Sequence, residues 1–86
     1  MALEHLGYID LPPHTGSGGF DHAVVHTRRG LLYVAHTAND ADDVIDCVGR
    51  TYLRSIAGQP PVAGALVSEA ADIVFTSNRA DNTLRI

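Results

Sequence analysis

Short apolar runs alternate with turn-forming residues along the whole chain. β-Branched, aliphatic and aromatic residues, which β-strands favour, gather in short runs near 20–27, 31–37, 42–47, 50–56, 62–68, 72–78 and 83–86. Proline, glycine, asparagine and aspartate, which favour turns, separate these runs at 12–13, 16–19, 39–40, 58–61 and 81–82. No window has the apolar spacing of a long amphipathic helix. The pattern therefore predicts an all-β chain of short antiparallel strands.

The strand pattern repeats once, with a period of about 42 residues. Residues 20–26 align with 62–68 without a gap, and 31–36 align with 73–78, so that apolar positions coincide at nearly every core position. A period of about 40–45 residues with four strands is typical of one blade of a β-propeller. The sequence therefore predicts one two-blade module over residues 1–86, with blade 1 at 20–56 and an incomplete blade 2 at 62–86.

Both copies carry a recognisable motif. Residues 33–37 read Tyr-Val-Ala-His-Thr, residues 43–46 read Asp-Val-Ile-Asp, and residues 74–78 read Val-Phe-Thr-Ser-Asn. These segments resemble the YVTN repeat of lactonase-like β-propellers, whose second strand reads Tyr-Val-Thr-Asn and whose third ends in Val-Ile-Asp. The resemblance implies blades of four antiparallel strands, lettered A to D outward from a central axis. It implies little about activity, because YVTN-type propellers include binding scaffolds, surface proteins and relatives of enzymes.

The strand count predicts that the chain assembles with copies of itself. Blade 2 has strands A to C, whereas residues 4–11 resemble a D strand that has no blade of its own. In a propeller the D strand precedes the A strand of the next blade, so 4–11 is expected to pair beside 83–86 of a neighbouring copy. A homotrimer would give six blades and is favoured; a tetramer would give eight. The alternative is a truncated fragment of a longer reading frame.

Composition and charge exclude several function classes. The net charge of −4 and the single adjacent cation pair, Arg28 and Arg29, argue against a nucleic-acid surface. No apolar stretch is long enough to span a membrane, and residues 1–10 lack the features of a signal peptide, so a cytoplasmic location is expected. One cysteine, Cys47, allows no intrachain disulfide. A chain of this length is therefore expected to gain stability from association, metal or both.

Histidines and carboxylates gather in the loops that the resemblance assigns to one mouth of the axial channel. There the D–A and B–C loops, at 12–21, 37–41, 58–63 and 78–82, bring together His14, Asp21, His22, His36, Asn39, Asp40, Asn78, Arg79 and Asp81. His26 ends a strand and is expected at the opposite end. The mouth is thus the predicted ligand site.

His22 is the leading candidate because it begins strand A, the strand nearest the axis. Threefold symmetry would bring three copies of His22 together, with Asp21 and His36 as further ligands for Zn²⁺, Mn²⁺ or Fe²⁺, and Ca²⁺ as a weaker possibility. The predicted activity is hydrolysis of activated esters, lactones or phosphotriesters by a metal-bound hydroxide, with Asp21, His36 and Arg79 as catalytic residues. The similarity to metal-dependent lactonase propellers is an analogy, since their ligands are mainly Asn, Asp and Glu.

Structural interpretations of the same residues stay open. His22 would then line the channel, His36 would bond the next blade, and His14 would be solvated. Residues 39–43, Asn-Asp-Ala-Asp-Asp, lack the glycine and distal glutamate of a calcium loop and suggest a solvated hairpin turn. Neither the serines nor Cys47 lie in a nucleophile motif. The alternative function is a non-catalytic binding or assembly module.

Overall fold

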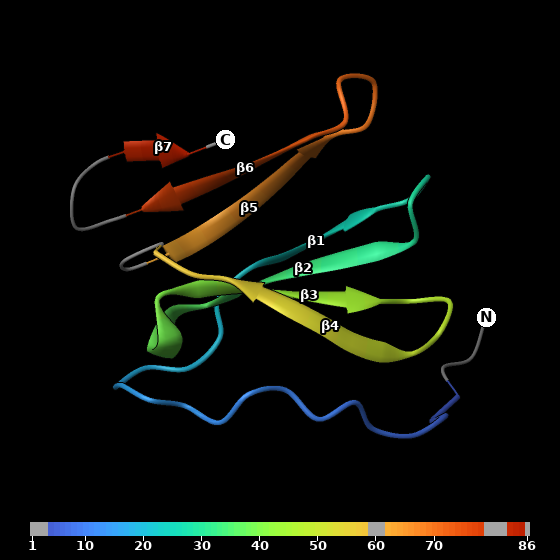
Figure 1. Cartoon of the computed structure of the whole chain (residues 1–86), viewed down its shortest axis with the longest axis horizontal. Helices are drawn as coiled ribbons and strands as arrows, with labels where there is room; N and C mark the ends of the chain where they lie inside the picture. The colour runs from blue at the N-terminus through green and yellow to red at the C-terminus, as the bar shows by residue number, and fades with distance from the viewer. Residues whose placement is uncertain (1–3, 59–61, 79–82, 86) are drawn as a thin grey trace.

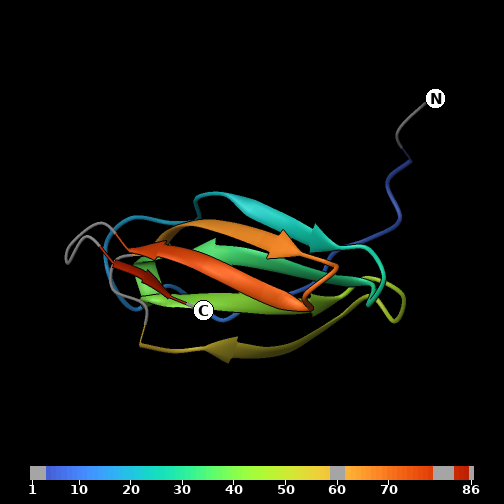
Figure 2. The same ribbon diagram turned by 90° about the horizontal axis from the view of Figure 1, so that it is seen from above.

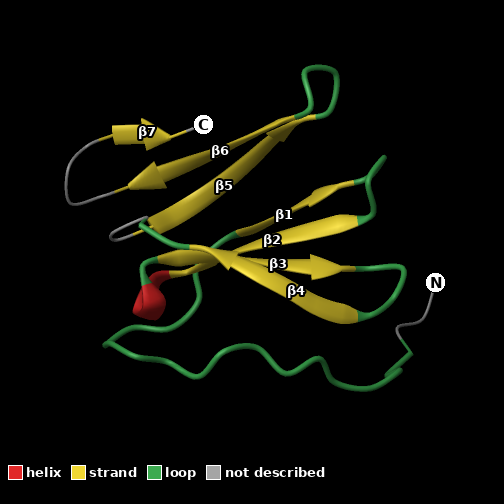
Figure 3. Cartoon of the chain, viewed as in Figure 1, coloured by secondary structure: helices red, strands yellow, loops and turns green. Residues whose placement is uncertain are grey.

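The computed structural model describes residues 4–58, 62–78 and 83–85, which form two antiparallel β-sheets (Figure 1). A single turn of 3₁₀ helix, η1 (Thr37–Asn39), interrupts the strands and is the one helical element of the described residues (Figure 3). The strands are β1 (Ala23–His26), β2 (Leu31–His36), β3 (Ala41–Asp46), β4 (Thr51–Ile56), β5 (Val62–Ser68), β6 (Ile73–Asn78) and β7 (Thr83–Arg85). No helix of the described segments is long and apolar enough to cross a membrane.

Consecutive strands pair with one another in both sheets. The first sheet has the order β1-β2-β3-β4 and the second has the order β5-β6-β7. All of the pairings are antiparallel, and the strands begin and end within a few residues of the predicted runs. The prediction of an all-β chain built from short antiparallel strands is therefore confirmed.

Two segments differ from the prediction. β1 begins at Ala23 rather than near residue 20, although the ladder continues through bonds from the Asp21 amide to the Ala35 carbonyl (2.8 Å) and from the Ala35 amide to the His22 carbonyl (2.9 Å). Residues 4–11 form no strand in the single chain and run past β4 on the side away from the second sheet (Figure 1). Their predicted pairing with a neighbouring copy stays a prediction, because it involves a second chain.

Each sheet presents one face to the other sheet, which we call its inner face. Side chains alternate along a strand, and the contact between His26 and Asp72 of the second sheet identifies the inner face of the first. The inner residues include Tyr33, Ala35 and Val44, all buried. β5 lies against β1 and β2 and contributes the buried Val62 (Figure 2). The contact between the sheets is therefore formed mainly by β1 and β2 on one side and β5 on the other.

A polar cluster joins the two sheets at the end where β1 finishes. The His26 side chain is buried and its Nε2 lies 3.0 Å from Oδ1 of Asp72. The Arg29 guanidinium binds both oxygens of the same carboxylate, and this contact holds the pKa of Asp72 near 2, well below its usual range. The Arg28 amide donates to Oε1 of Glu69 (2.8 Å). The prediction that His26 lies at the end opposite the loops of residues 12–21 is confirmed.

The packing of the first sheet can be tested with two valines. Val44 is completely buried at the centre of β3, whereas Val48 lies 84% exposed in the next turn. We expect Val44→Ala to lower the free energy of unfolding by about 2 kcal/mol, through lost burial of methyl groups and the cavity that remains. Val48→Ala should change it by less than about 0.5 kcal/mol. Urea unfolding measures both; equal effects would contradict the burial pattern.

Candidate functional site

The loops that the sequence assigns to one mouth do lie together at one end of the two sheets. The His22 amide donates to the Ala63 carbonyl (3.2 Å), and the Thr37 hydroxyl donates to the Val62 carbonyl (2.7 Å). These bonds join the start of the first sheet, η1 and the start of β5. The described candidates Asp21, His22 and His36 therefore share this end of the molecule.

The predicted metal ligands do not meet within one chain. The His22 side chain is 80% exposed, and its Nε2 lies 3.4 Å from Oδ1 of Asp21. His36 is fully buried, and both of its ring nitrogens contact other side chains. Over residues 4–58, 62–78 and 83–85, no three His, Cys, Asp or Glu side chains are grouped to hold a metal. A site shared between copies stays a prediction, and Arg79 lies outside the described residues.

His36 belongs instead to a network on the outer face of the first sheet. Its Nδ1 lies 2.7 Å from Oδ2 of Asp43, and neither side chain is exposed. Oδ1 of Asp43 accepts a hydrogen bond from the Ser55 hydroxyl (2.7 Å), whose oxygen lies 2.7 Å from the Tyr52 hydroxyl. Asp43 is opposite both Val34 and Ser55 in the sheet, so its carboxylate reaches His36 diagonally. Both carboxylate oxygens are thus satisfied.

A β-bulge places Tyr52 and Ser55 on the same face. The pairing of β3 with β4 shifts between Val44 and Ile45, which leaves Leu53 as an extra residue of β4. Residues three apart in a regular strand would point to opposite faces. The extra residue shifts the alternation of side chains by one position, so that both side chains point to the same face. The bulge therefore extends the polar network to β4.

The outer end of the network is an exposed loop histidine, His14. Its Nδ1 lies 2.6 Å from Nε2 of His36, and the Phe20 ring stacks on His36 with centroids 4.2 Å apart. Asn39 holds the loop on either side of this histidine. Its Oδ1 accepts from the Thr15 amide (2.7 Å), and its Nδ2 donates to the Pro13 carbonyl (3.0 Å).

Several interpretations of these residues were wrong. Residues 42 and 43 are not part of a solvated turn: they lie in β3 and are completely buried. His14 is exposed but bonded to His36, and His36 is bonded within its own sheet rather than to another blade. Sequence reasoning also missed Ser55 and Tyr52. The predicted strand near 42–47 already contained residues 42 and 43 and was the available signal against a turn.

Asp42 lies on the inner face and differs sharply from its neighbour. Its side chain is fully buried, and within the described structure neither carboxylate oxygen has a hydrogen-bond partner. Burial, and secondarily the negative charge of Asp43, raise the pKa of Asp42 to about 6. Asn78, at the same end of the second sheet, is also buried without a hydrogen-bond partner for its amide. Both groups reduce the stability of the contact between the sheets.

Comparison with known proteins identifies no relative of this chain. No protein-family model, no curated protein and no solved structure matches the chain. The resemblance of residues 33–37 and 43–46 to the YVTN repeat therefore stays a prediction.

The pKa of Asp42 predicts an unusual dependence of stability on pH. Between about pH 4 and pH 6 the folded protein binds this proton more tightly than the unfolded chain, so the free energy of unfolding falls as pH rises. The shift from 3.8 to about 6 corresponds to about 3 kcal/mol. Asp42→Asn should remove that fall and be more stable than the natural protein at pH 7. The measurement is urea unfolding from pH 4 to pH 7.

Asp40→Asn is the matched control, since Asp40 is exposed in the preceding turn. Its stability should follow the natural curve at every pH. If the Asp42→Asn curve also ran parallel to the natural one, the carboxyl group would not be buried in the ionised state at pH 7.

Proposed function

We propose that this chain is a β-propeller blade module that functions by binding copies of itself. Each sheet corresponds to one blade, and the outer face of the second sheet packs on the first sheet of the next copy. The trimer with six blades remains the favoured ring, with the eight-bladed tetramer as the alternative. The single observation that carries the proposal is an uncovered apolar face on the second sheet.

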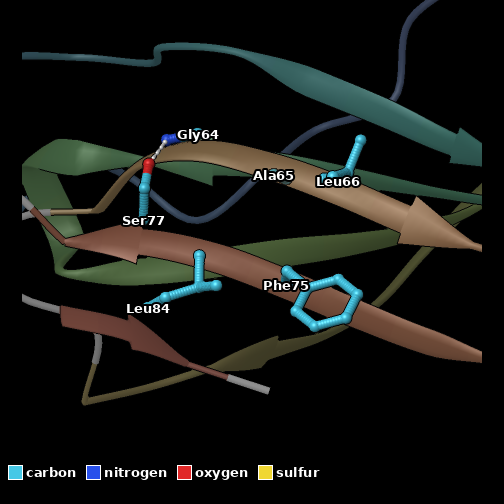
Figure 4. Close-up of a pocket in the computed structure, with 6 residues that line it drawn as sticks. All are labelled: Gly64, Ala65, Leu66, Phe75, Ser77 and Leu84. Carbon is cyan, nitrogen blue, oxygen red and sulfur yellow. Dashed lines mark hydrogen bonds between the residues drawn. The ribbon is translucent and has the colours of Figure 1, made fainter.

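That face carries a hollow of about 320 Å³ (Figure 4). Leu66 is opposite Phe75 and Ser77 is opposite Leu84, so these side chains lie on one face. Leu66 and Leu84 are 64% and 65% exposed, whereas Thr76 and Asn78 on the inner face are buried. The hollow is lined by Gly64, Ala65, Leu66, Phe75, Ser77 and Leu84. Exposed apolar surface of this kind favours association.

The occupant we favour is another sheet of the same repeat. Within the chain, the two copies of the repeat already pack face to face, with β5 against β1 and β2. The outer face of the first sheet offers a matching apolar strip: Val25, 47% exposed, is opposite Leu32, and Val34 lies on the same face. A head-to-tail ring would repeat the packing between the two sheets at every subunit boundary.

Charge introduced into the hollow tests the proposal. The natural protein should form a ring, trimeric by light scattering, and Leu66→Glu should give folded monomer, because a carboxylate would be buried without a partner. We expect at least a tenfold weaker association. Val48→Glu, at an 84% exposed turn position, should leave the ring intact. A natural protein that is a stable folded monomer at micromolar concentration would overturn the proposal.

A second candidate, the metal-dependent hydrolase, is favoured by the position of His22. Its exposed side chain lies directly before β1, with the Asp21 carboxylate 3.4 Å away. In a ring with β1 at the axis, three such pairs would converge and could bind Zn²⁺, Mn²⁺ or Fe²⁺. The metal would supply a hydroxide for attack on an ester, a lactone or a phosphotriester.

His22→Ala tests this candidate. Elemental analysis should find one divalent ion per ring in the natural protein and none in the variant, while light scattering finds both assembled. His5→Ala, another exposed histidine, is the control and should keep the metal. Equal metal content in the natural protein and His22→Ala would exclude His22 as the ligand.

A further inference from the structure

The hydrogen-bond network on the first sheet has a defined direction. An ionised carboxylate only accepts hydrogen bonds, so Asp43 fixes the protons of its partners. His36 donates from Nδ1 to Asp43, which leaves Nε2 of His36 as an acceptor. His14 then donates from Nδ1 to that nitrogen, 2.6 Å away. In this arrangement Nε2 of His14, an exposed residue, has a free lone pair and can accept a proton.

We propose that this Asp43–His36–His14 relay is a metal-free general-base site that hydrolyses small neutral esters. His14 is the catalytic base, and His36 and Asp43 are positioning residues that act through it. Its base is His14 rather than His22, and within this chain both ring nitrogens of His36, a predicted metal ligand, are occupied by His14 and Asp43. It also does not require assembly into a ring, because all three residues come from one chain.

Burial strengthens the electrostatic interaction between the members of the relay. The Asp43 and His36 side chains are both completely buried, so the attraction between the carboxylate and an imidazolium is weakly screened. When His14 accepts a proton at Nε2, its Nδ1 proton can shift towards His36, and the positive charge then faces Asp43. Ser55 bonds the other carboxylate oxygen and holds it in place. The network thus places a buried carboxylate behind the base and orients its Nε2 to accept a proton from water.

The loop fixes where His14 sits. Asn39 bonds the residues before and after it, and the Thr15 hydroxyl also donates to Oδ1 of Asn39 (3.1 Å). A Cβ added at Gly16 would lie 2.7 Å from the Ala38 carbonyl oxygen, which shows how closely the loop packs on η1. An exposed side chain held by its neighbours in this way loses little freedom on reaction.

A hollow beside His14 has room for a small substrate. Its volume is about 350 Å³, and Phe20 closes it on the side of His36. Apolar side chains dominate the lining, and Asp10 contributes one carboxylate, which disfavours anionic substrates. The lining residues are Ile9, Asp10, Leu11, Pro12, Pro13, His14 and Phe20. This chemistry suits an uncharged ester with a short acyl chain.

The reaction is balanced with water as the only co-reactant. The oxygen of a water molecule forms a bond to the ester carbonyl carbon while its proton passes to Nε2 of His14. The tetrahedral intermediate then breaks its bond to the alcohol oxygen, which takes the proton back from Nε2. Acid and alcohol leave, and the relay returns to its starting state.

Hydrolysis of p-nitrophenyl butyrate in the presence of EDTA tests the site. The natural protein should have a rate constant per mole at least tenfold above that of free imidazole at pH 7.5. His14→Ala should remove at least nine-tenths of it, whereas the control His5→Ala, another exposed histidine, should retain it. A natural rate equal to that of imidazole, or unchanged hydrolysis in His14→Ala, would overturn the proposal. Activity abolished by EDTA would assign hydrolysis to a metal.

Two further variants test positioning separately from folding. Asp43→Asn removes the carboxylate that accepts from Nδ1 of His36, so we expect a lower kcat with KM unchanged. Because Asp43 is buried, Asn39→Ala on the surface provides a second measurement. It should leave the circular dichroism unchanged and lower kcat/KM at least threefold by releasing the loop. Identical pH profiles and rates in Asn39→Ala and the natural protein would show that His14 is not positioned by the network.

Discussion

The buried hydrogen bond between His36 and Asp43 determines how four segments of the chain meet. It joins β2 to β3 directly, reaches β4 through Ser55, and holds the N-terminal loop through His14. Two ionisable groups completely removed from water are costly unless every polar atom is satisfied. Here both carboxylate oxygens and both ring nitrogens have partners. Loss of one partner would leave an uncompensated charge, at a cost of about 3–5 kcal/mol.

The two adjacent aspartates of β3 differ in their hydrogen bonding because they point to opposite faces of the sheet. Asp43 points to the outer face and is fully bonded, whereas Asp42 points to the inner face and has no partner in the described structure. The first contributes a network that orders the loop at the end of the sheet. The second weakens the contact between the sheets, since its ionised form is buried against apolar side chains. A carboxylate that stabilises its surroundings and one that weakens the contact between the sheets therefore occupy adjacent positions of β3.

The same alternation gives the two sheets outer faces of different character. The inner faces cover each other through Tyr33, Val44 and Val62. The outer face of the second sheet is apolar and suits another sheet, while the outer face of the first combines an apolar strip near Val25 with the polar network near β4. The hollow of the second sheet is thus separate from the polar network, whereas the apolar strip that would receive it shares the outer face of the first sheet with that network.

The sequence by itself determined the all-β class, the strand positions and the end of the sheets where the loops gather, because these follow from local residue preferences and a period of about 42 residues. It placed His36 at this end but not beside Asp43, and it assigned residues 42 and 43 both to a strand and to a solvated turn. Asp42 is buried on the face that meets the second sheet, whereas Asp43 is buried on the outer face, where it contacts His36 of β2 and Ser55 of β4. The extra residue Leu53, which turns Tyr52 and Ser55 to one face, has no signature in composition. Strand formation is local, whereas the partners of a buried charge are set by register and packing, which only the tertiary structure decides.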